Sequence, residues 1–287
     1  MKIQWYPGHM TKARRAMEQD IKLVDLVIEL LDARTPLASR NPDIDKLGAN
    51  KLCLILLNKS DVADPAVNRR WKSWFESKGY TVVLLDSRSG AGKKQVQAAV
   101  SQVCQAKIER DRRRGILNRP VRAMVVGIPN VGKSTFINTF AGKAVAKTGN
   151  KPGVTRGNQW IRLNKEVELL DTPGILWPKF EDPEVGVHLA MIGSVNDEIL
   201  DIRELACELL KLLRTLYPEK LQERYSFSEE ELAQETKTGF ELLEKIAKIR
   251  GCLLKGQELD TEKAARLVMD DFRSGRLGQI SIERPEE

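Results

Sequence analysis

Apolar and polar positions along the first 177 residues follow a pattern that predicts strands separated by helices. Short runs that are apolar almost throughout predict buried strands, and longer stretches with apolar residues at helical spacing predict helices. The strands are expected at residues 23–31, 51–57, 81–85, 121–126, 160–163 and 167–170, with residues 164–165 as a turn. The helices are expected at residues 65–78, 92–112 and 133–142. This alternation predicts an α/β domain with a mostly parallel sheet that is flanked by helices.

The residues after Trp177 follow a different pattern. Pro178, Pro183 and Gly186 punctuate a linker-like stretch, and residues 187–273 show helical spacing without strand-like alternation. We therefore expect a smaller, all-helical region there. The apolar stripe expected along one helix of this region consists of Leu232, Phe240, Leu243, Ile246 and Ala247.

Capping residues predict where helices of this second region begin and end. Ser228 followed by Glu231 fits a capping box that opens a helix. Asp260 or Thr261 is expected to open a last helix, and Gly275 stands just past its end. The expected domains are residues 1–177 and residues 178–287.

Residues 127–134 fit the pattern G-x-x-x-x-G-K-[ST] of a phosphate-binding loop. The loop follows the apolar run 121–126 and opens a predicted helix, so backbone amides and a helix N-terminus would form an anion cradle. Lys133 is expected to reach the β- and γ-phosphates and to serve in catalysis, and Ser134 is expected to bind Mg²⁺. Further nucleotide contacts are expected from Asn130, Val131, Gly132 and Thr135.

Asn58, Lys59, Ser60 and Asp61 read N-K-x-D directly after a predicted strand, which is the box that recognises guanine. Guanine presents two adjacent donors on its Watson–Crick edge, and an ionised Asp61 can accept from both, whereas adenine lacks that pair. Such a bidentate contact is worth about 1–3 kcal/mol in base discrimination. Asn58 can serve the O6/N7 side of the base and tie the box to the phosphate loop.

Asp86 and Ser87 follow the predicted strand at residues 81–85, at the place where GTPases close over the base. Arg88 and Ser89 replace the small residue and the lysine that usually follow this serine, so the match is loose. Ligands of parallel sheets bind outside the carboxyl ends of the strands. The residues expected to converge on that edge are Asn58, Ser87, Gly127 and Asp171.

Asp171-Thr-Pro-Gly174 reads D-x-x-G, a sensor of the γ-phosphate. Asp171 would hold Mg²⁺ through water, and Gly174 would offer its amide to the phosphate. Thr155 lies in a stretch that resembles a first switch loop and would take part in catalysis by binding Mg²⁺ in the GTP state; a plain loop threonine is the alternative. The guanine box precedes the phosphate loop, so the order is rotated and the chain runs from Gly174 straight into the helical region.

The glutamine that many GTPases place after D-x-x-G to orient water is missing. Ile175 and Leu176 occupy that place, and neither side chain can orient water. His9 is flanked by Gly8 in a predicted mobile loop, and we take it as the hypothesis for the water-positioning residue. His188 is instead expected to pack or cap near the start of the helical region.

The chain carries a net charge of +7 and an isoelectric point near 9.2, which favours a polyanionic partner such as RNA; a merely soluble basic protein is the alternative. Four cysteines form no C-x-x-C pair, so neither a zinc site nor a disulfide framework is indicated, which fits a reducing cytosol. No signal peptide and no apolar run of membrane-spanning length are visible. The basic run proposed to face RNA, with a solvated surface as its alternative, is Arg110, Arg112, Arg113, Arg114, Arg119 and Arg122.

The motifs together closely resemble the bacterial ribosome biogenesis GTPase A family of circularly permuted GTPases. The resemblance covers the whole chain and is carried by the rotated box order, the opening Trp5-Tyr6-Pro7-Gly8-His9-Met10, Asp32-Ala33-Arg34 and residues 171–178. It implies a cytoplasmic P-loop GTPase domain followed by a small helical domain linked to RNA binding. It also implies a hydrophobic residue in place of the glutamine, as at Ile175, and a K⁺ held against the phosphates by Asn130.

By this resemblance the chain is a GTP-hydrolysing switch that acts in late assembly of the large (50S) ribosomal subunit. The implied partners are the large-subunit precursor, its rRNA and its ribosomal proteins, with no membrane, and we expect a monomer. The implied substrate is GTP with Mg²⁺, and K⁺ is a further hypothesis. Two alternatives stay open: a nucleotide-gated RNA-binding scaffold with negligible hydrolysis, and a GTPase that acts on the small subunit or on tRNA.

Overall fold

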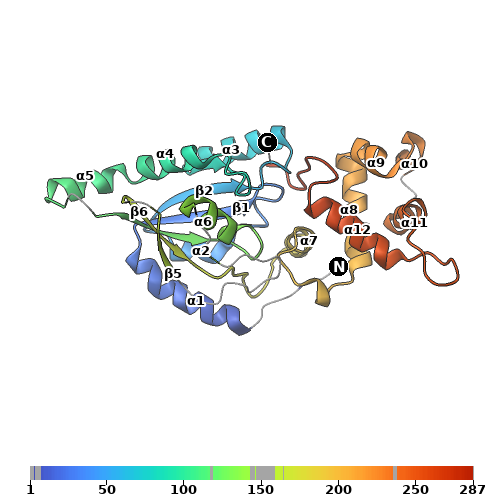
Figure 1. The fold of residues 1–287 in the computed structure, drawn as a ribbon, viewed down its shortest axis with the longest axis horizontal. Coiled ribbons are helices and arrows are strands. Elements are labelled where there is room, and N and C mark those ends of the chain that lie inside the picture. The colour runs from blue at the N-terminus through green and yellow to red at the C-terminus, as the bar shows by residue number, and fades with distance from the viewer. Residues whose placement is uncertain are drawn as a thin grey trace.

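The structure is a computed structural model of the 287-residue chain. It places a sheet with helices on both faces beside a group of helices that form one end of the molecule (Figure 1). None of the helices among the described residues combines the length and apolar content that a membrane crossing needs. The residues that the structure describes are 3, 8–116, 119–142, 146, 159–163, 165–234 and 238–286, with only the backbone of His9.

The sheet has six strands in the order β3-β2-β1-β4-β6-β5. All neighbours are parallel except β5, which is the antiparallel edge strand. Each predicted strand is present with its ends shifted by at most three residues, and the predicted turn includes Asn164, which lies outside the described residues. The strands are β1 (Leu26–Asp32), β2 (Leu52–Asn58), β3 (Thr81–Leu84), β4 (Val121–Val126), β5 (Gln159–Arg162) and β6 (Val167–Asp171).

Helices cover both faces of the sheet because the central strands are apolar on both sides, and β1 is buried along its whole length. Leu26, Ile28 and Leu30 of β1 belong to the core cluster beneath α4 and α6, and Val27 and Leu31 point to the opposite face, where α1, α2 and α3 pack. The helices are α1 (Gly8–Asp20), α2 (Pro42–Leu47), α3 (Pro65–Ser77), α4 (Lys93–Val103), α5 (Gln105–Arg113) and α6 (Lys133–Ala141), with a 3₁₀ turn η1 (Ile21–Leu23).

The single helix expected at residues 92–112 is two helices, α4 and α5, that meet at Cys104. The backbone hydrogen bonds continue through the junction, since Cys104 N donates to Val100 O (3.0 Å) and Ile108 N donates to Cys104 O (2.9 Å). Both angles of Cys104, φ −92° and ψ 5°, depart from the helical values. The difference is therefore a local kink, which periodicity alone does not reveal.

The remaining helices form what we call the helical region, residues 183–273. Ser228 and Glu231 make the predicted capping box, and Asp260, not Thr261, caps the last helix by accepting from Lys263 N. Helix α7 already begins at Pro183, inside the stretch expected to be a linker. The helices are α7 (Pro183–Met191), α8 (Ile202–Leu216), α9 (Pro218–Tyr225), α10 (Glu229–Ala233), α11 (Gly239–Ile249) and α12 (Thr261–Arg273), with a 3₁₀ turn η2 (Asp197–Ile199).

The apolar stripe predicted along one helix is wrong in part, because its residues belong to two helices, α10 and α11. Thr238 opens α11 with a second capping box, which the sequence pattern did not predict, and this start sets which residues face inward. Phe240 is 45% exposed, whereas Leu242 is buried in its place. Leu232, Leu243, Ile246 and Ala247 are buried as expected.

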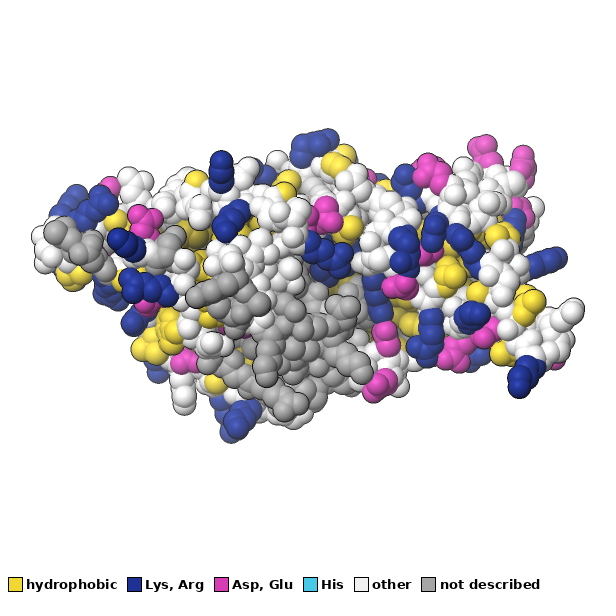
Figure 2. Space-filling view, viewed as in Figure 1, with side chains coloured by type: hydrophobic (Ala, Val, Ile, Leu, Met, Phe, Trp, Pro, Cys, Tyr) yellow, Lys and Arg dark blue, Asp and Glu magenta, His cyan; other side chains and the backbone are white. Residues whose placement is uncertain are grey.

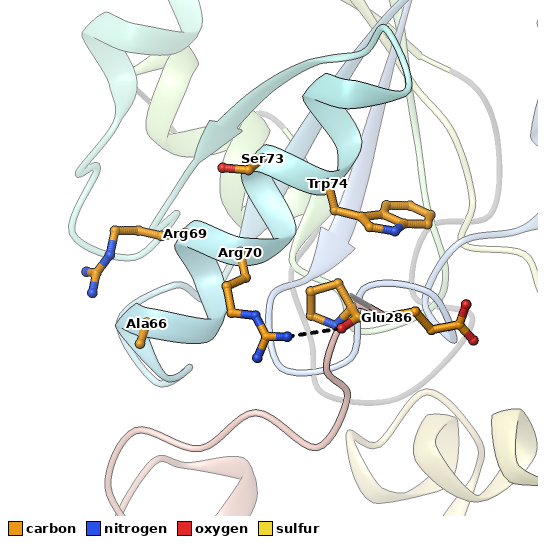
Figure 3. Close-up of a pocket in the computed structure, with 7 residues that line it drawn as sticks. Ala66, Arg69, Arg70, Ser73, Trp74 and Glu286 are labelled. Carbon is orange, nitrogen blue, oxygen red and sulfur yellow. Dashed lines mark hydrogen bonds between the residues drawn. The ribbon is translucent and has the colours of Figure 1, made fainter.

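The residues after α12 leave the helical region and return to the sheet. Ile280 N donates to Val62 O (3.0 Å), and Ile282 N donates to Arg34 O (2.8 Å). Figure 3 shows the guanidinium of Arg70 on α3 bonded to the backbone oxygen of Pro285 (3.3 Å), beside a hollow that contains no residue of the nucleotide boxes. The C-terminal tail, residues 279–286, therefore packs against the strand-and-helix part of the molecule, and the division at residue 177 stays a prediction.

Candidate nucleotide-binding site

Asn58 at the end of β2 joins three of the predicted boxes through its side-chain amide. Its Oδ1 accepts from Ser87 N (3.1 Å) and Ser87 Oγ (2.8 Å), and its Nδ2 donates to Val131 O (2.7 Å). Asn58 is 1% exposed, so all three bonds are buried. The guanine box, the Ser87 loop and the phosphate loop thus meet at the carboxyl edge of the sheet, which we call the nucleotide edge.

Two glycines let this edge close tightly. Gly132 has a φ of +103°, and a Cβ there would collide with the side-chain nitrogen of Asn58. A Cβ on Gly174 would lie 2.8 Å from Pro129 N and 2.9 Å from Lys133 Nζ. The D-x-x-G segment and the phosphate loop therefore touch through a position that admits no side chain, which is what a sensor close to the phosphates requires.

Lys133 and Asp171 are a buried pair of opposite charges at this edge. The Lys133 ammonium donates to Gly127 O (2.9 Å) and Ile128 O (2.7 Å), and burial lowers its pKa to about 8 although the Asp171 carboxylate opposes the shift. Burial raises the pKa of Asp171 to about 6, against the nearby charge of Lys133. A phosphate group would favour the charged form of Lys133 by adding a second anion to that of Asp171.

The residues at this edge fit a magnesium ion. Asp171 is 3% exposed, and its Oδ1 has no hydrogen-bond partner among the described residues. Asp171 and the hydroxyl of Ser134, in the first turn of α6, supply the hard oxygen donors that Mg²⁺ prefers. When bound, the ion would neutralise charge on the β- and γ-phosphates. Thr155, the other predicted ligand, lies outside the described residues.

The side chains that replace the usual glutamine point into the core. Ile175 is 2% exposed in the cluster beneath α1, and Leu176 is 1% exposed in the cluster beneath α4 and α6. His188 on α7 packs as expected, since it is 7% exposed and its Nδ1 lies 3.1 Å from Glu283 Oε1 in the tail. Neither apolar side chain can position water.

The predicted mobile loop around His9 is wrong, because His9 is the second residue of helix α1. Met10 and Met17 are buried at 0% and 1% exposure, seven residues apart on one face, and anchor the helix against the core. The sequence shows no capping residue before Gly8, which is why the helix start was missed. The structure does not describe the side chain of His9.

Asp32 and Arg34, which entered the sequence analysis only as a family signature, form a buried ionic centre next to the guanine box. Arg34 donates to Asp32 through Nε (2.9 Å) and Nη2 (2.8 Å), and Lys59 Nζ lies 3.0 Å from Asp32 Oδ2. Although burial opposes it, these cations hold the pKa of Asp32 well below its usual range. Arg34 also donates to Phe272 O (3.3 Å) at the end of α12. Their spacing gave no signal, since only the fold makes them neighbours of Lys59.

Both nucleotide boxes form hydrogen bonds with residues in the C-terminal half of the chain. In the phosphate loop, Asn130 Nδ2 donates to Gly193 O (2.6 Å), and Pro129 O accepts from Ser194 Oγ (2.8 Å). In the guanine box, Asp61 O accepts from Gln279 Nε2 (3.1 Å). These hydrogen bonds connect the phosphate loop to the turn after α7 and the guanine box to the C-terminal tail.

The chain is similar in sequence to a family of known proteins. A family model described as "50S ribosome-binding GTPase" matches residues 122–244. The "Ribosome biogenesis GTPase A" of Bacillus cereus is 47% identical over 289 residues, which cover 100% of this chain and 95% of that protein. The chain belongs to the ribosome biogenesis GTPase A family. The Thermotoga maritima member is 32% identical over 285 residues, which cover 99% of this chain and 95% of that protein.

Solved structures of the family support the fold. The GNP-bound YlqF of T. maritima has a TM-score of 0.65 at 28% sequence identity, covering 96% of this chain and 99% of that chain. Its GDP-bound form has a TM-score of 0.67 at 28% identity, covering 94% and 99%. As a member of the family the chain is a GTP-hydrolysing enzyme with a circularly permuted P-loop GTPase fold and a helical C-terminal region.

Proposed function

We propose that this GTPase is a molecular switch in the late maturation of the large (50S) ribosomal subunit, and that it binds rRNA in its GTP state. The observation that carries the proposal is the direct bonding of both nucleotide boxes to the helical region and tail, through Asn130–Gly193 and Asp61–Gln279. The name of the relatives and the family model's description support a ribosomal partner. The proposal includes a cytoplasmic, monomeric protein with domains at residues 1–177 and 178–287.

The switch acts through these bonds. GTP holds the D-x-x-G segment near the phosphate loop at Gly174, and hydrolysis releases it. The loop's neighbours Gly193 and Ser194 directly follow α7, and Arg273 of α12 donates to Ala190 O (2.7 Å) and Met191 O (3.0 Å) of α7. A shift in the phosphate loop therefore reaches α12 through two hydrogen-bonded steps, and α12 belongs to the region that we propose binds RNA.

Co-sedimentation with purified large and small ribosomal subunits tests the proposal. Binding to large subunits should be tighter with a non-hydrolysable GTP analogue than with GDP, at fixed salt concentration. A complete switch needs a differential of about 5 kcal/mol between the two states, and a partial switch needs less. Equal binding in both nucleotide states would remove the switch, and preferential binding to small subunits or tRNA would move the function to that partner.

Catalysis without the glutamine needs another group, and we propose His9 for that role. The hypothesis is that His9, in the first turn of α1, orients or polarises the attacking water after the ribosomal partner has bound, and that Thr155 completes the Mg²⁺ site. His9→Ala should lower subunit-stimulated turnover roughly 10²-fold. Its affinity for GTP should stay unchanged, because Lys133, Ser134 and Asp61 carry binding. Wild-type stimulated turnover in the variant would exclude His9.

We also propose that Asn130 helps to hold K⁺ against the phosphates, where a cation would stabilise charge that develops during hydrolysis. In the structure its amide nitrogen donates to Gly193 O, and the side-chain oxygen is the atom whose lone pairs can coordinate a cation. Turnover should then be faster in KCl than in NaCl at equal ionic strength. Asn130→Ala should remove the difference between the two salts, and an unchanged difference would refute the assignment.

A further inference from the structure

The end of α5 is a strongly basic surface at the opposite end of the molecule from the helical region (Figure 1). Residues 105–122 contain seven Lys or Arg and two acidic residues, a net charge of +5 when the whole chain has +7. Figure 2 shows a group of Lys and Arg side chains at this end, on the left of the view, and others over the rest of the same face. Most of the excess charge of the chain therefore lies in one short segment.

The basic side chains of this segment differ in how they are paired. Lys107 is 7% exposed and lies 3.3 Å from Asp25 and 3.1 Å from Asp111, so it is part of the fold. Four arginines within five positions at the end of the helix are exposed, and no salt bridge among the described residues involves them. These four are Arg110, Arg112, Arg113 and Arg114.

A helix C-terminus favours cations by about 0.3–1 kcal/mol each, and only within its last turn. Four guanidinium groups in five residues exceed that need and repel one another. Arg110, Arg113 and Arg114 are spaced three and four residues apart and so lie on one side of the helix. The fold neither pairs nor buries these charges, which points to an anionic partner outside the chain.

An exposed aromatic side chain accompanies the arginines. Trp160 on the edge strand β5 is 40% exposed, and the Arg122 guanidinium carbon lies 5.2 Å from its ring centre. Arg122, Glu168 and Arg162 are cross-strand partners on β4, β6 and β5, and alternation puts Trp160 on their face of the sheet. An open indole beside guanidinium groups suits the stacking of an unpaired base.

We propose that the end of α5 together with Trp160 and Arg122 is a second RNA-binding surface, which holds phosphates and a stacked base whichever nucleotide is bound. This rests on the proposed function and specifies where RNA is held. RNA fits better than an acidic protein, because guanidinium forks match phosphate and only a nucleic acid offers a base to the indole. Arg119 and Arg122 lie at the start of β4, and the phosphate loop follows its end. The strand, roughly 20 Å long at about 3.3 Å per residue, therefore separates this surface from the nucleotide.

The test compares the full-length triple variant Arg110→Gln, Arg113→Gln, Arg114→Gln with a control that removes equal charge from α3 and its C-cap residue. The control variant is Arg69→Gln, Lys72→Gln, Lys78→Gln. Each binds purified large subunits, and protein-free rRNA extracted from them, over a series of KCl concentrations with a GTP analogue or GDP. Thermal melting should be unchanged in both variants, because the altered side chains are exposed or half-buried.

The α5 variant should bind rRNA at least 10-fold more weakly at low salt, by the same factor in both nucleotide states. The slope of log K against log salt should become shallower by about 0.7–0.9 for each phosphate that the variant no longer neutralises. Trp160→Ala should weaken binding roughly 5- to 100-fold, as expected for one stacked base, and Trp160→Phe should keep most of the affinity. The α3 control should bind almost as the wild type does.

Three results overturn the proposal: unchanged affinity of the α5 variant, equal weakening in the α5 variant and the α3 control, or a weakening that appears only in the GTP state. Weaker binding to intact subunits but not to extracted rRNA would assign the surface to a ribosomal protein instead. Failure of the wild type to bind large subunits would defeat the proposed function, whereas extracted rRNA would still report on the α5 surface.

Discussion

Charged side chains are buried and paired at the nucleotide edge of the sheet, whereas the arginines near the opposite edge are exposed. At the nucleotide edge, Asp32, Arg34 and Lys133 are 0%, 1% and 6% exposed, and each is bonded within the protein. At the other edge, Arg112 and its neighbours on α5 are exposed without a salt bridge among the described residues. Charge that is buried and paired fixes geometry for one ligand, whereas exposed and unpaired charge attracts an extended polyanion in a manner sensitive to salt.

Two carboxylates at the nucleotide edge show that burial alone does not set the direction of a pKa shift. The carboxylates of Asp32 and Asp171 are both buried at the nucleotide edge, yet their pKa values move in opposite directions. Asp32 has two cations at hydrogen-bond distance, while Asp171 has one nearby ammonium and an oxygen without a hydrogen-bond partner among the described residues. The first is a completed structural pair, whereas the second keeps one oxygen without a partner among the described residues, as the predicted Mg²⁺ site would require.

The largest expected effect breaks the buried pair at Arg34. Arg34→Ala leaves the Asp32 carboxylate buried beside Lys59 alone and removes the bond to Phe272 O, so the free energy of unfolding should fall by about 3–5 kcal/mol. Urea denaturation measures the change. The double variant Asp32→Asn, Arg34→Met should recover part of it, because it removes both charges. A decrease below about 1 kcal/mol in the single variant would show that the pair is not the structural centre described above.

A second prediction concerns a buried acid on β1 with incomplete partners. Burial raises the pKa of Glu29 from 4.5 to about 7, although Arg40 opposes the shift, and Glu29 Oε1 has no hydrogen-bond partner among the described residues. The folded protein then binds this proton more tightly than the unfolded chain does. Its contribution is complete below about pH 4.5 and is lost as pH rises through about 7, by about 3 kcal/mol in total.

Denaturation at several pH values between 5 and 8 checks the Glu29 prediction. Glu29→Gln cannot titrate, so the decline in unfolding free energy across this window should be smaller in the variant than in the wild type by about 3 kcal/mol. Parallel pH profiles for the two proteins would mean that Glu29 ionises normally in the folded state.

The third prediction addresses guanine recognition at the nucleotide edge. Asp61→Asn replaces one acceptor oxygen with a donor that opposes guanine, so GTP should bind more weakly by about 1–3 kcal/mol, and xanthosine triphosphate should gain relative to it. Competition binding with GTP, ATP and xanthosine triphosphate measures the preference. Wild-type binding of ATP as tight as that of GTP would end the assignment of this box.

The smallest expected effect lies at the opposite edge. Arg112→Gln should change the free energy of unfolding by less than about 0.5 kcal/mol, because the side chain is exposed and has no salt bridge among the described residues. Urea denaturation of Arg112→Gln and Arg34→Ala under the same conditions compares the two changes in the free energy of unfolding directly. A destabilisation above about 1 kcal/mol would mean that the α5 arginines are structural after all.

Much of this protein could be predicted from the sequence, because its strands are continuous apolar runs and its boxes are local motifs. The six strands, the Ser228 capping box and the phosphate loop depend on residues within about a dozen positions of one another, so their signals survive without a fold. The kink at Cys104, the start of α1 at Gly8 and the outward turn of Phe240 were missed, since packing and local capping decide them.

The sequence by itself determined the α/β class and the permuted order of the boxes, and it predicted the chemistry of the nucleotide edge. Only the tertiary structure decided which distant residues share that edge: Arg34 with Phe272, Asn130 with Gly193, and Asp61 with Gln279. Each of these bonds joins residues 63 to 238 positions apart, and the polar atoms involved have many possible partners in an unfolded chain. The packing of the fold brings each pair together, in surroundings that range from buried at Arg34–Phe272 to exposed at Asp61–Gln279, and no local pattern records that selection.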